Sequence, residues 1–230
     1  MAKRILLVSV FAAIVAGGAF AQVGLGAGYI DSGRSMGAMA RESSRYGDAT
    51  YDYGNTSRGG FLFLDATYAE LSLGLVSGIL SAPGIVTDKD GKLSYAAIGG
   101  FDSILSMDIG LLGRYPIRVA KITVSPLLGV GYNLVLSAKY RTGNDIKWGK
   151  GDLPAEAGDF STIRIMLGAG ADFDVTDHVF ARMGYTAHYR FAPKAIAKVA
   201  ERLSNEDAKY GKGKNGGFGG TITFAVGYRF

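Results

Sequence analysis

Apolar residues alternate with small or polar ones along most of the chain, which is the period of a β-strand with two different faces. The pattern is clearest over residues 218–230, where one face is apolar and aromatic and the other is mainly glycine and threonine. A strand of a membrane barrel has this division, with apolar side chains toward lipid and small or polar ones toward the lumen. Seven earlier segments share the pattern, at residues 23–29, 61–68, 70–79, 105–115, 122–132, 162–173 and 178–191.

The connections between these segments alternate between short and long. Short turns fall near residues 69, 116–121 and 174–177, and long polar connections cover residues 33–58, 80–102, 138–159 and 192–216. Barrels of the outer membrane have short turns at one end and long loops at the other. The sequence therefore predicts an all-β fold, a closed antiparallel up-and-down transmembrane β-barrel of eight strands. Ten strands are the alternative if residues 93–101 also cross, but we assign that segment to the second outer loop.

Pro126 lies inside the fifth predicted strand. Proline cannot donate a hydrogen bond to a neighbouring strand, so it is disfavoured in the middle of a sheet. We expect a bulge or a locally unpaired position there.

The first residues have the order of a secretory signal peptide. Lys3 and Arg4 precede an apolar stretch, and Ala19-Phe20-Ala21 supplies the small residues of a cleavage site. A transmembrane helix is disfavoured because Ser9 and two glycines interrupt a stretch that is shorter than the roughly 20 residues needed. We predict a signal peptide at residues 1–21 and a barrel domain at residues 22–230.

Composition narrows the chemistry. The chain has no cysteine, so it can form neither disulfides nor thiolate metal sites. The net charge of +5 comes from lysines and arginines that are scattered along the chain, which argues against a nucleic-acid surface. Membrane lipid is the expected neighbour, and no cofactor is predicted.

The strand pattern places a set of charged residues on the inner face. Eight strands leave an interior that side chains can fill, so these charges are expected to pair across the lumen or, alternatively, to line a narrow path. The predicted inner charges are Asp65, Glu70, Asp108, Arg114, Lys121, Arg164, Asp172, Arg182, His188, Arg190 and Arg229.

Metal binding and catalysis have little support in the sequence. His178 and His188 are the only histidines, and neither belongs to a metal-binding spacing. A hydrolase needs a serine, a histidine and a carboxylate that meet, and no serine neighbours His188 in the sequence. We predict neither a metal site nor an enzyme.

Two of the long connections carry candidate contact residues. Tyr46, Tyr51 and Tyr53 lie among glycine, serine and charged residues in the first, a composition suited to protein or glycan contact. In the last, apolar residues at helical spacing between positions 196 and 203 predict a short amphipathic helix packed on the barrel rim.

The chain resembles the small outer-membrane barrels of the OmpA, OmpX and OmpW type, and in style the OmpX/OmpW-like barrels of spirochaetes. The resemblance covers nearly all of residues 22–230 and includes Arg114-Tyr-Pro-Ile117 and Pro126-Leu-Leu-Gly-Val-Gly-Tyr132. The ending, with Phe224, Tyr228 and Phe230, is similar to the signal that the barrel-assembly machinery reads in this superfamily. The resemblance implies an outer-membrane location.

Several functions fit such a barrel. The leading hypothesis is a non-enzymatic surface protein whose outer loops contact host, glycan or envelope partners. The alternative is an OmpW-like channel for small hydrophobic solutes, which predicts an apolar funnel that leads into the upper lumen.

Overall fold

The computed structural model describes residues 23–44, 47–88, 93–140, 157–194, 208–212 and 216–230. The predicted signal peptide, Tyr46 and the predicted amphipathic helix between positions 196 and 203 lie outside these residues. No helix in the described ranges has the length and apolar character to cross a membrane.

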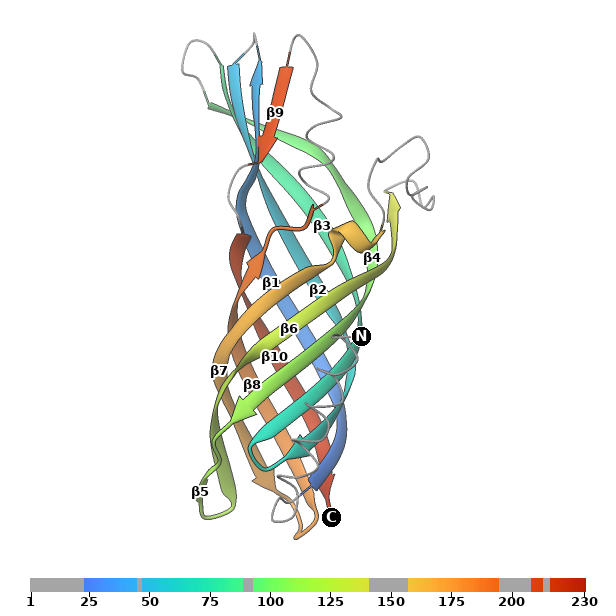
Figure 1. Ribbon diagram of the computed structural model, residues 1–230, viewed down its shortest axis with the longest axis vertical. Helices are drawn as coiled ribbons and strands as arrows, with labels where there is room; N and C mark the ends of the chain where they lie inside the picture. The colour runs from blue at the N-terminus through green and yellow to red at the C-terminus, as the bar shows by residue number, and fades with distance from the viewer. Residues whose placement is uncertain (1–22, 45–46, 89–92, 141–156, 195–207, 213–215) are drawn as a thin grey trace, which may run out of the picture.

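The described residues form one closed antiparallel barrel (Figure 1). Eight long strands run around it in the order β10-β8-β7-β6-β4-β3-β2-β1, and pairing between β1 and β10 closes the sheet, so the predicted fold is confirmed. Two short strands, β5 and β9, complete the sheet. The bounds are β1 Val23–Ser44, β2 Gly47–Ala66, β3 Ala69–Asp88, β4 Leu93–Arg114, β5 Ile117–Val119, β6 Ile122–Tyr140, β7 Thr162–Asp174, β8 Val179–Phe191, β9 Ala208–Lys212 and β10 Gly216–Arg229, with a 3-10 turn at Ala157–Phe160.

The strands differ in length on the two sides of the barrel. β1 to β4 have 20 to 22 residues each, whereas β7, β8 and β10 have 13 or 14. The extra residues of β1 to β4 continue past the barrel at the end opposite the short turns, and β9 pairs with β1 there (Figure 1). We call this five-stranded extension, with strand order β4-β3-β2-β1-β9, the projecting sheet.

The projecting sheet corrects the predicted connections. Residues 33–58 and 80–102 are mostly strand, so the long loops expected there are wrong. Residues 93–101 belong to β4 itself and add no strand to the barrel. Tyr51 and Tyr53, predicted as loop contacts, lie on β2. Residues 208–212, also predicted as loop, form β9.

Pro126 does not form a bulge. The pairing of β6 with β7 runs through it without a register shift, with Pro126 opposite Ala169. On its other side it faces the break between β4 and β5, where Tyr115 N donates to Pro126 O at 3.3 Å. The N–H that proline lacks would therefore point at a place where no strand-to-strand hydrogen bond is required. This is the locally unpaired position that the sequence predicted as the alternative to a bulge.

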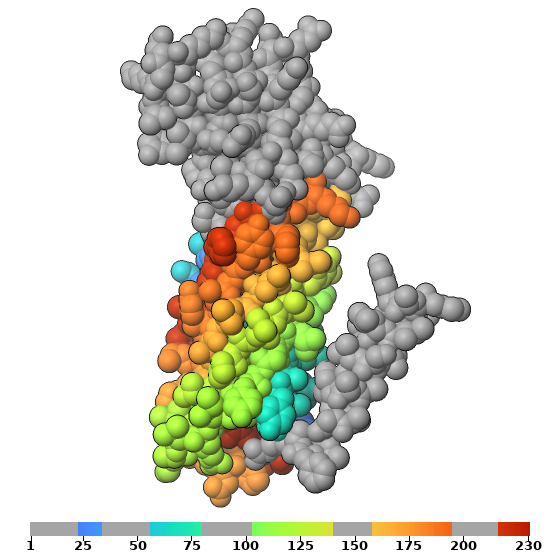
Figure 2. All heavy atoms as spheres, turned by 60° about the vertical axis from the view of Figure 1, so that its left-hand side comes forward, coloured from blue at the N-terminus to red at the C-terminus, as the bar shows by residue number. Residues whose placement is uncertain are grey.

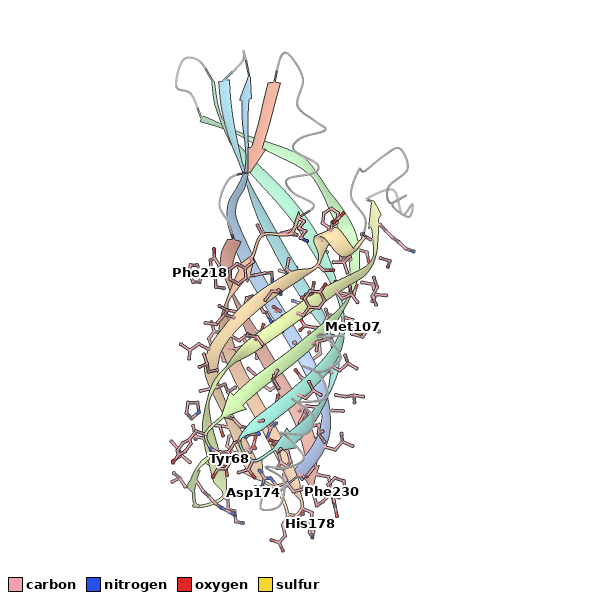
Figure 3. All side chains as sticks on the ribbon, in the orientation of Figure 1. Tyr68, Met107, Asp174, His178, Phe218 and Phe230 are labelled. Atoms are coloured by element: carbon pink, nitrogen blue, oxygen red, sulfur yellow. The ribbon has the colours of Figure 1, made fainter. Side chains whose placement is uncertain are left out.

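The outer wall carries apolar side chains. Figure 2 shows the tilted strands β6 to β8 as diagonal rows along this wall. Aromatic residues flank this band at both ends, with Phe218 toward the projecting sheet and Tyr68 and Phe230 at the short turns (Figure 3). The stretch of β10 from Phe218 to Tyr228 matches the roughly 9–11 residues that a tilted strand needs to cross a bilayer. The wall therefore has the dimensions and polarity of a transmembrane barrel.

Candidate functional site: the charged lumen

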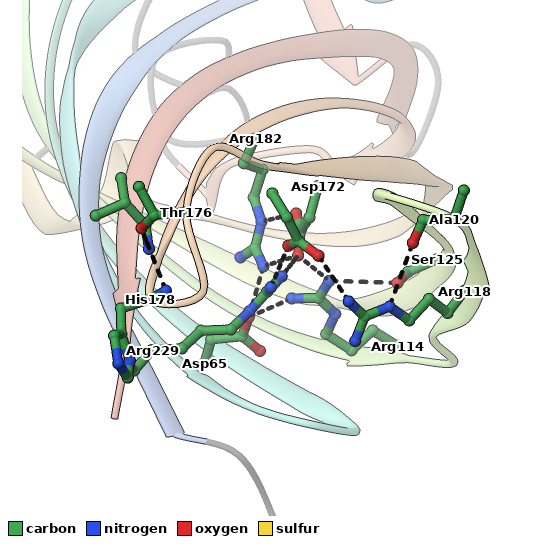
Figure 4. Close-up of polar contacts among 12 residues, drawn as sticks. Asp65, Arg114, Arg118, Ala120, Ser125, Asp172, Thr176, His178, Arg182 and Arg229 are labelled. Atoms are coloured by element: carbon green, nitrogen blue, oxygen red, sulfur yellow. Dashed lines mark hydrogen bonds and ion pairs between the residues drawn. The ribbon is translucent and has the colours of Figure 1, made fainter.

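Alternation brings charged side chains from six strands to one level of the lumen, near the short turns (Figure 4). β2, β3 and β7 contribute carboxylates, and β4, β8 and β10 contribute arginines. We call these six residues the basal ion-pair cluster: Asp65, Glu70, Asp172, Arg114, Arg182 and Arg229.

Arg182 lies at the centre of the basal ion-pair cluster. Its Nε donates to Asp172 Oδ1 at 2.6 Å, its Nη1 to Glu70 Oε2 at 2.6 Å, and its Nη2 to Asp65 Oδ2 at 2.5 Å. A planar guanidinium can make such contacts in several directions at once, which lysine cannot. One side chain of β8 thereby connects β2, β3 and β7 across the interior.

The other two arginines complete the cluster. Arg114 donates to Asp65 at 2.5 Å and to Asp172 at 2.9 Å, and Arg229 lies 3.2 Å from the same Asp172. Three carboxylates and three guanidinium groups have formal charges that cancel. Such pairing and hydrogen bonding is the condition under which charges can remain buried.

Two phenylalanines pack against the cluster. Phe63 is 1% exposed and Phe180 is fully buried, with ring centroids 6.1 Å apart. The Arg182 guanidinium lies 4.6 Å from the centre of the Phe63 ring, and that of Arg229 lies 4.3 Å from the Phe180 ring. These are cation–π distances. The lumen is thus closed at this level by a layer of both charged and aromatic groups.

Glycines make room for the two rings. A Cβ at Gly26 would lie 2.3 Å from Phe63, and one at Gly227 would lie 2.3 Å from Phe180. Gly26 is on β1 and Gly227 is on β10. The absence of a side chain therefore lets each ring lie directly on the backbone.

A second ion pair lies above the cluster. Arg164 donates from both Nη atoms to the carboxylate of Asp108, at 2.5 and 2.7 Å, and its Nε lies 3.1 Å from Met166 Sδ. This fork-to-fork geometry is the strongest arrangement for such a pair. Between the pair and the cluster is a cavity of about 60 Å³, enough for a few water molecules.

The next level holds neutral polar groups and Arg190. Arg190 Nη1 donates to Thr162 Oγ1 at 3.0 Å. Thr221 Oγ1 donates to Ser32 Oγ at 3.0 Å and lies 3.5 Å from His188 Nδ1. A serine thus lies near His188 after all, which sequence order alone did not reveal, but the Thr221 hydroxyl separates them.

Most of the charged residues predicted for the lumen lie there, and one does not. Lys121 is exposed in the turn between β5 and β6, so its assignment to the lumen was wrong. Ala120 beside it has a φ of 56°, a turn conformation that interrupts the strand alternation from which Lys121 was placed. Arg118, on β5, instead reaches Asp174 at 3.1 Å near the mouth.

The mouth at the short turns is an open recess. It has a volume of about 230 Å³ and is bordered by Arg118, Arg229 and the lower side of the basal ion-pair cluster. Asp174 also bonds to Arg229. Within the described residues, no group of three or more histidine, aspartate or glutamate side chains is arranged to hold a metal ion.

Comparisons with known proteins give similarity in fold alone. No family model matches the chain, and no curated protein does. Among solved structures, Neisserial surface protein A is 15% identical, with 89% of this chain and 99% of that chain covered and a TM-score of 0.37. The attachment invasion locus protein Ail of Yersinia pestis is 14% identical, with 91% and 99% covered and a TM-score of 0.37. The translocator domain of the autotransporter NalP of Neisseria meningitidis is 14% identical, with 100% and 96% covered and a TM-score of 0.26.

Proposed function

We propose that this protein is a non-conducting barrel of the outer membrane that holds the projecting sheet outside the membrane for contact with a protein or glycan partner. The observation that carries the proposal is the basal ion-pair cluster, which closes the lumen. A closed barrel leaves the outer end as the region available for function. The proposal includes neither an enzyme nor a cofactor.

The projecting sheet supports a role in contact. Backbone pairing of β1 with β2 extends from the barrel, at Gly33–Thr56, into the sheet, at Arg41–Thr50, with two register shifts between Ser35 and Ala40. A partner would therefore meet a surface ordered by strand pairing, which reduces the entropy lost on binding. Among the described residues, 93–98 of β4 pair only with β3, so this edge offers free backbone groups to an added strand.

The OmpW-like channel is the second candidate, and the described lumen counts against it. A hydrophobic solute needs a continuous apolar path. The interior instead holds the basal ion-pair cluster, the Asp108–Arg164 pair and Arg190 at successive levels. The cavity of about 60 Å³ is too small for most solutes.

The proposal places the barrel in the outer membrane through the barrel-assembly machinery. Phe224, Tyr228 and Phe230 are exposed on the outer wall of the last strand, where a recognition factor could contact them. Their side chains alternate with inward residues such as Ala225. Recognition by the machinery remains the prediction made from the sequence.

Conductance and binding measurements test the two halves of the proposal. We expect no steady conductance from the refolded protein in a planar bilayer, and a steady conductance suppressed by hydrophobic solutes would refute the closed barrel.

For binding, the probes are immobilised glycans and a panel of biotinylated extracellular-matrix proteins. The matched variant replaces residues 36–53 and 81–100 with Asn-Gly turns, which suit two-residue hairpins. Equal binding by this variant and by the wild type would refute a role for the projecting sheet.

A further inference from the structure

The outer wall of β1 to β4 contains a groove that the lumen does not explain. It has a volume of about 420 Å³ and lies in the upper half of the barrel, near Met107 (Figure 3). Its outward-facing lining is apolar, and no polar side chain borders it. The side chains around it are those of Ala27, Leu62, Leu73, Leu75 and Met107, over the backbone of Gly28, Gly60 and Gly74.

Strand register explains why the groove forms. Tyr29, Gly60, Leu75 and Met107 are cross-strand partners in one row of the outer face. Gly60 contributes no side chain, so this row has a gap between larger neighbours. The next row toward the short turns is Ala27, Leu62, Leu73 and Ile109, in which the small Ala27 extends the gap.

The row on the other side of the gap is polar. Asp31, Arg58 and Ser77 are cross-strand partners on the same outer face, and each lies two residues beyond the groove row on its strand. Two residues of strand correspond to ~7 Å. A charged row therefore lies directly beyond the apolar groove, on the side of the projecting sheet.

Arg58 is available to an anion. Its side chain is 72% exposed, and its Nε pairs with Asp31 Oδ2 at 3.1 Å. Among the contacts given for the described residues, the two Nη groups have none, and they carry four further N–H donors. Asp31 therefore holds the guanidinium in the row next to the groove while leaving most of its donors for a ligand.

We propose that this groove and Arg58 form a binding site for one anionic phospholipid, with a hydrocarbon chain in the groove and the phosphate on the guanidinium. Lipid is the occupant because the groove lies within the apolar band of the wall, between its two aromatic ends. Arginine matches phosphate through paired N–H donors. The inference rests on the proposed membrane location and is independent of the projecting sheet's partner.

Two variants test the two parts of the site. Gly60→Leu fills the groove, and it should fold because a Cβ at Gly60 would lie 3.7 Å from Gly28 O, an ordinary contact. Arg58→Gln removes the cation and keeps the groove. Ala169→Leu is the control, since Ala169 lies exposed on the outer face of β7, away from the groove.

The proteins are refolded into vesicles of equal parts phosphatidylglycerol and phosphatidylcholine, extracted in mild detergent, and examined by native mass spectrometry. Heat-modifiable gel mobility confirms folding of each variant. We expect wild type and Ala169→Leu to retain one phosphatidylglycerol, and Gly60→Leu to retain roughly tenfold less lipid. Arg58→Gln should lose the preference for phosphatidylglycerol over phosphatidylcholine, and Asp31→Asn should increase it because a negative charge is removed.

Three outcomes would overturn the inference. In the first, Gly60→Leu retains as much lipid as Ala169→Leu. In the second, Arg58→Gln keeps the wild-type preference for phosphatidylglycerol. In the third, the wild type is a dimer that Gly60→Leu dissociates, which would assign the groove to a second copy of the chain. Failure to insert into vesicles at all would instead refute the proposed membrane barrel.

Discussion

Replacing Arg182 by methionine should destabilise the barrel strongly. Arg182 donates to all three carboxylates of the basal ion-pair cluster, at 2.5 to 2.8 Å. Methionine has a similar length but no donor, so Asp65, Glu70 and Asp172 would share the two remaining arginines. Removing one partner from a buried ion pair costs about 3–5 kcal/mol. We expect the free energy of unfolding to fall by about this amount.

The measurement is a urea titration in phospholipid vesicles. Heat-modifiable gel mobility reports the folded fraction, and far-ultraviolet circular dichroism reports the β-structure. Arg118→Met is the matched control because its side chain is 71% exposed and also pairs with an aspartate, Asp174. An exposed pair of this kind contributes at most about 1 kcal/mol.

Comparing the two variants shows whether an arginine–carboxylate pair stabilises the fold more when it is buried than when it is exposed. If Arg182→Met and Arg118→Met differ by less than about 1 kcal/mol, the basal ion-pair cluster does not stabilise the fold as the geometry indicates. An unchanged slope of unfolding against urea in both variants is needed for the comparison, because the slope follows the surface exposed on unfolding.

Three further predictions concern other parts of the barrel. Gly227→Val should prevent folding, because its Cβ would lie 2.3 Å from the Phe180 ring, and adding Phe180→Ala should restore folded protein on a heat-modifiable gel. Arg164→Met should lower the free energy of unfolding measured with urea by about 3–5 kcal/mol. The double variant Arg164→Met with Asp108→Leu should lose less, because it leaves no buried carboxylate without its partner. An equal or greater loss in the double variant contradicts this reasoning. Phe230→Ala should lower the amount of barrel assembled in cells while leaving refolding into vesicles unchanged, and an equal effect in both assays argues against a recognition signal.

The sequence predicted the barrel wall well because both faces of a membrane strand are under strong constraint. Lipid requires apolar side chains, and a narrow lumen requires small or paired polar ones, so the alternation is visible residue by residue. Leu62 and Phe63 illustrate this, one exposed on the wall and the other 1% exposed inside. Inner charges such as Asp172 could therefore be placed by parity.

The projecting sheet was missed for the opposite reason. Outside the membrane both faces of a strand can meet water, so a strand can be polar on both sides and lose its alternation. Residues 33–58 are rich in glycine, serine and charged residues, which is also the composition of loops. These residues pair because neighbouring strands lie beside them, and their own sequence carries no alternation that predicts a strand.

The partners of the lumen charges could not be predicted either. Which residues meet across the interior depends on the register and tilt of all eight strands, and Arg182 reaches Glu70 although 112 positions separate them. The packing of Phe63 on Phe180 depends on the same geometry. Only the presence of both signs of charge on the inner face was available from the sequence.

Because the strand lengths are unequal, the barrel is not symmetric about its own axis, and its two sides present different surfaces. The projecting sheet rises from β1 to β4, on one side of the barrel only, and the groove beside Gly60 lies on that same side. A partner held by the sheet would sit off the barrel axis, so the rotation of the barrel about the membrane normal decides which neighbouring molecules it can reach.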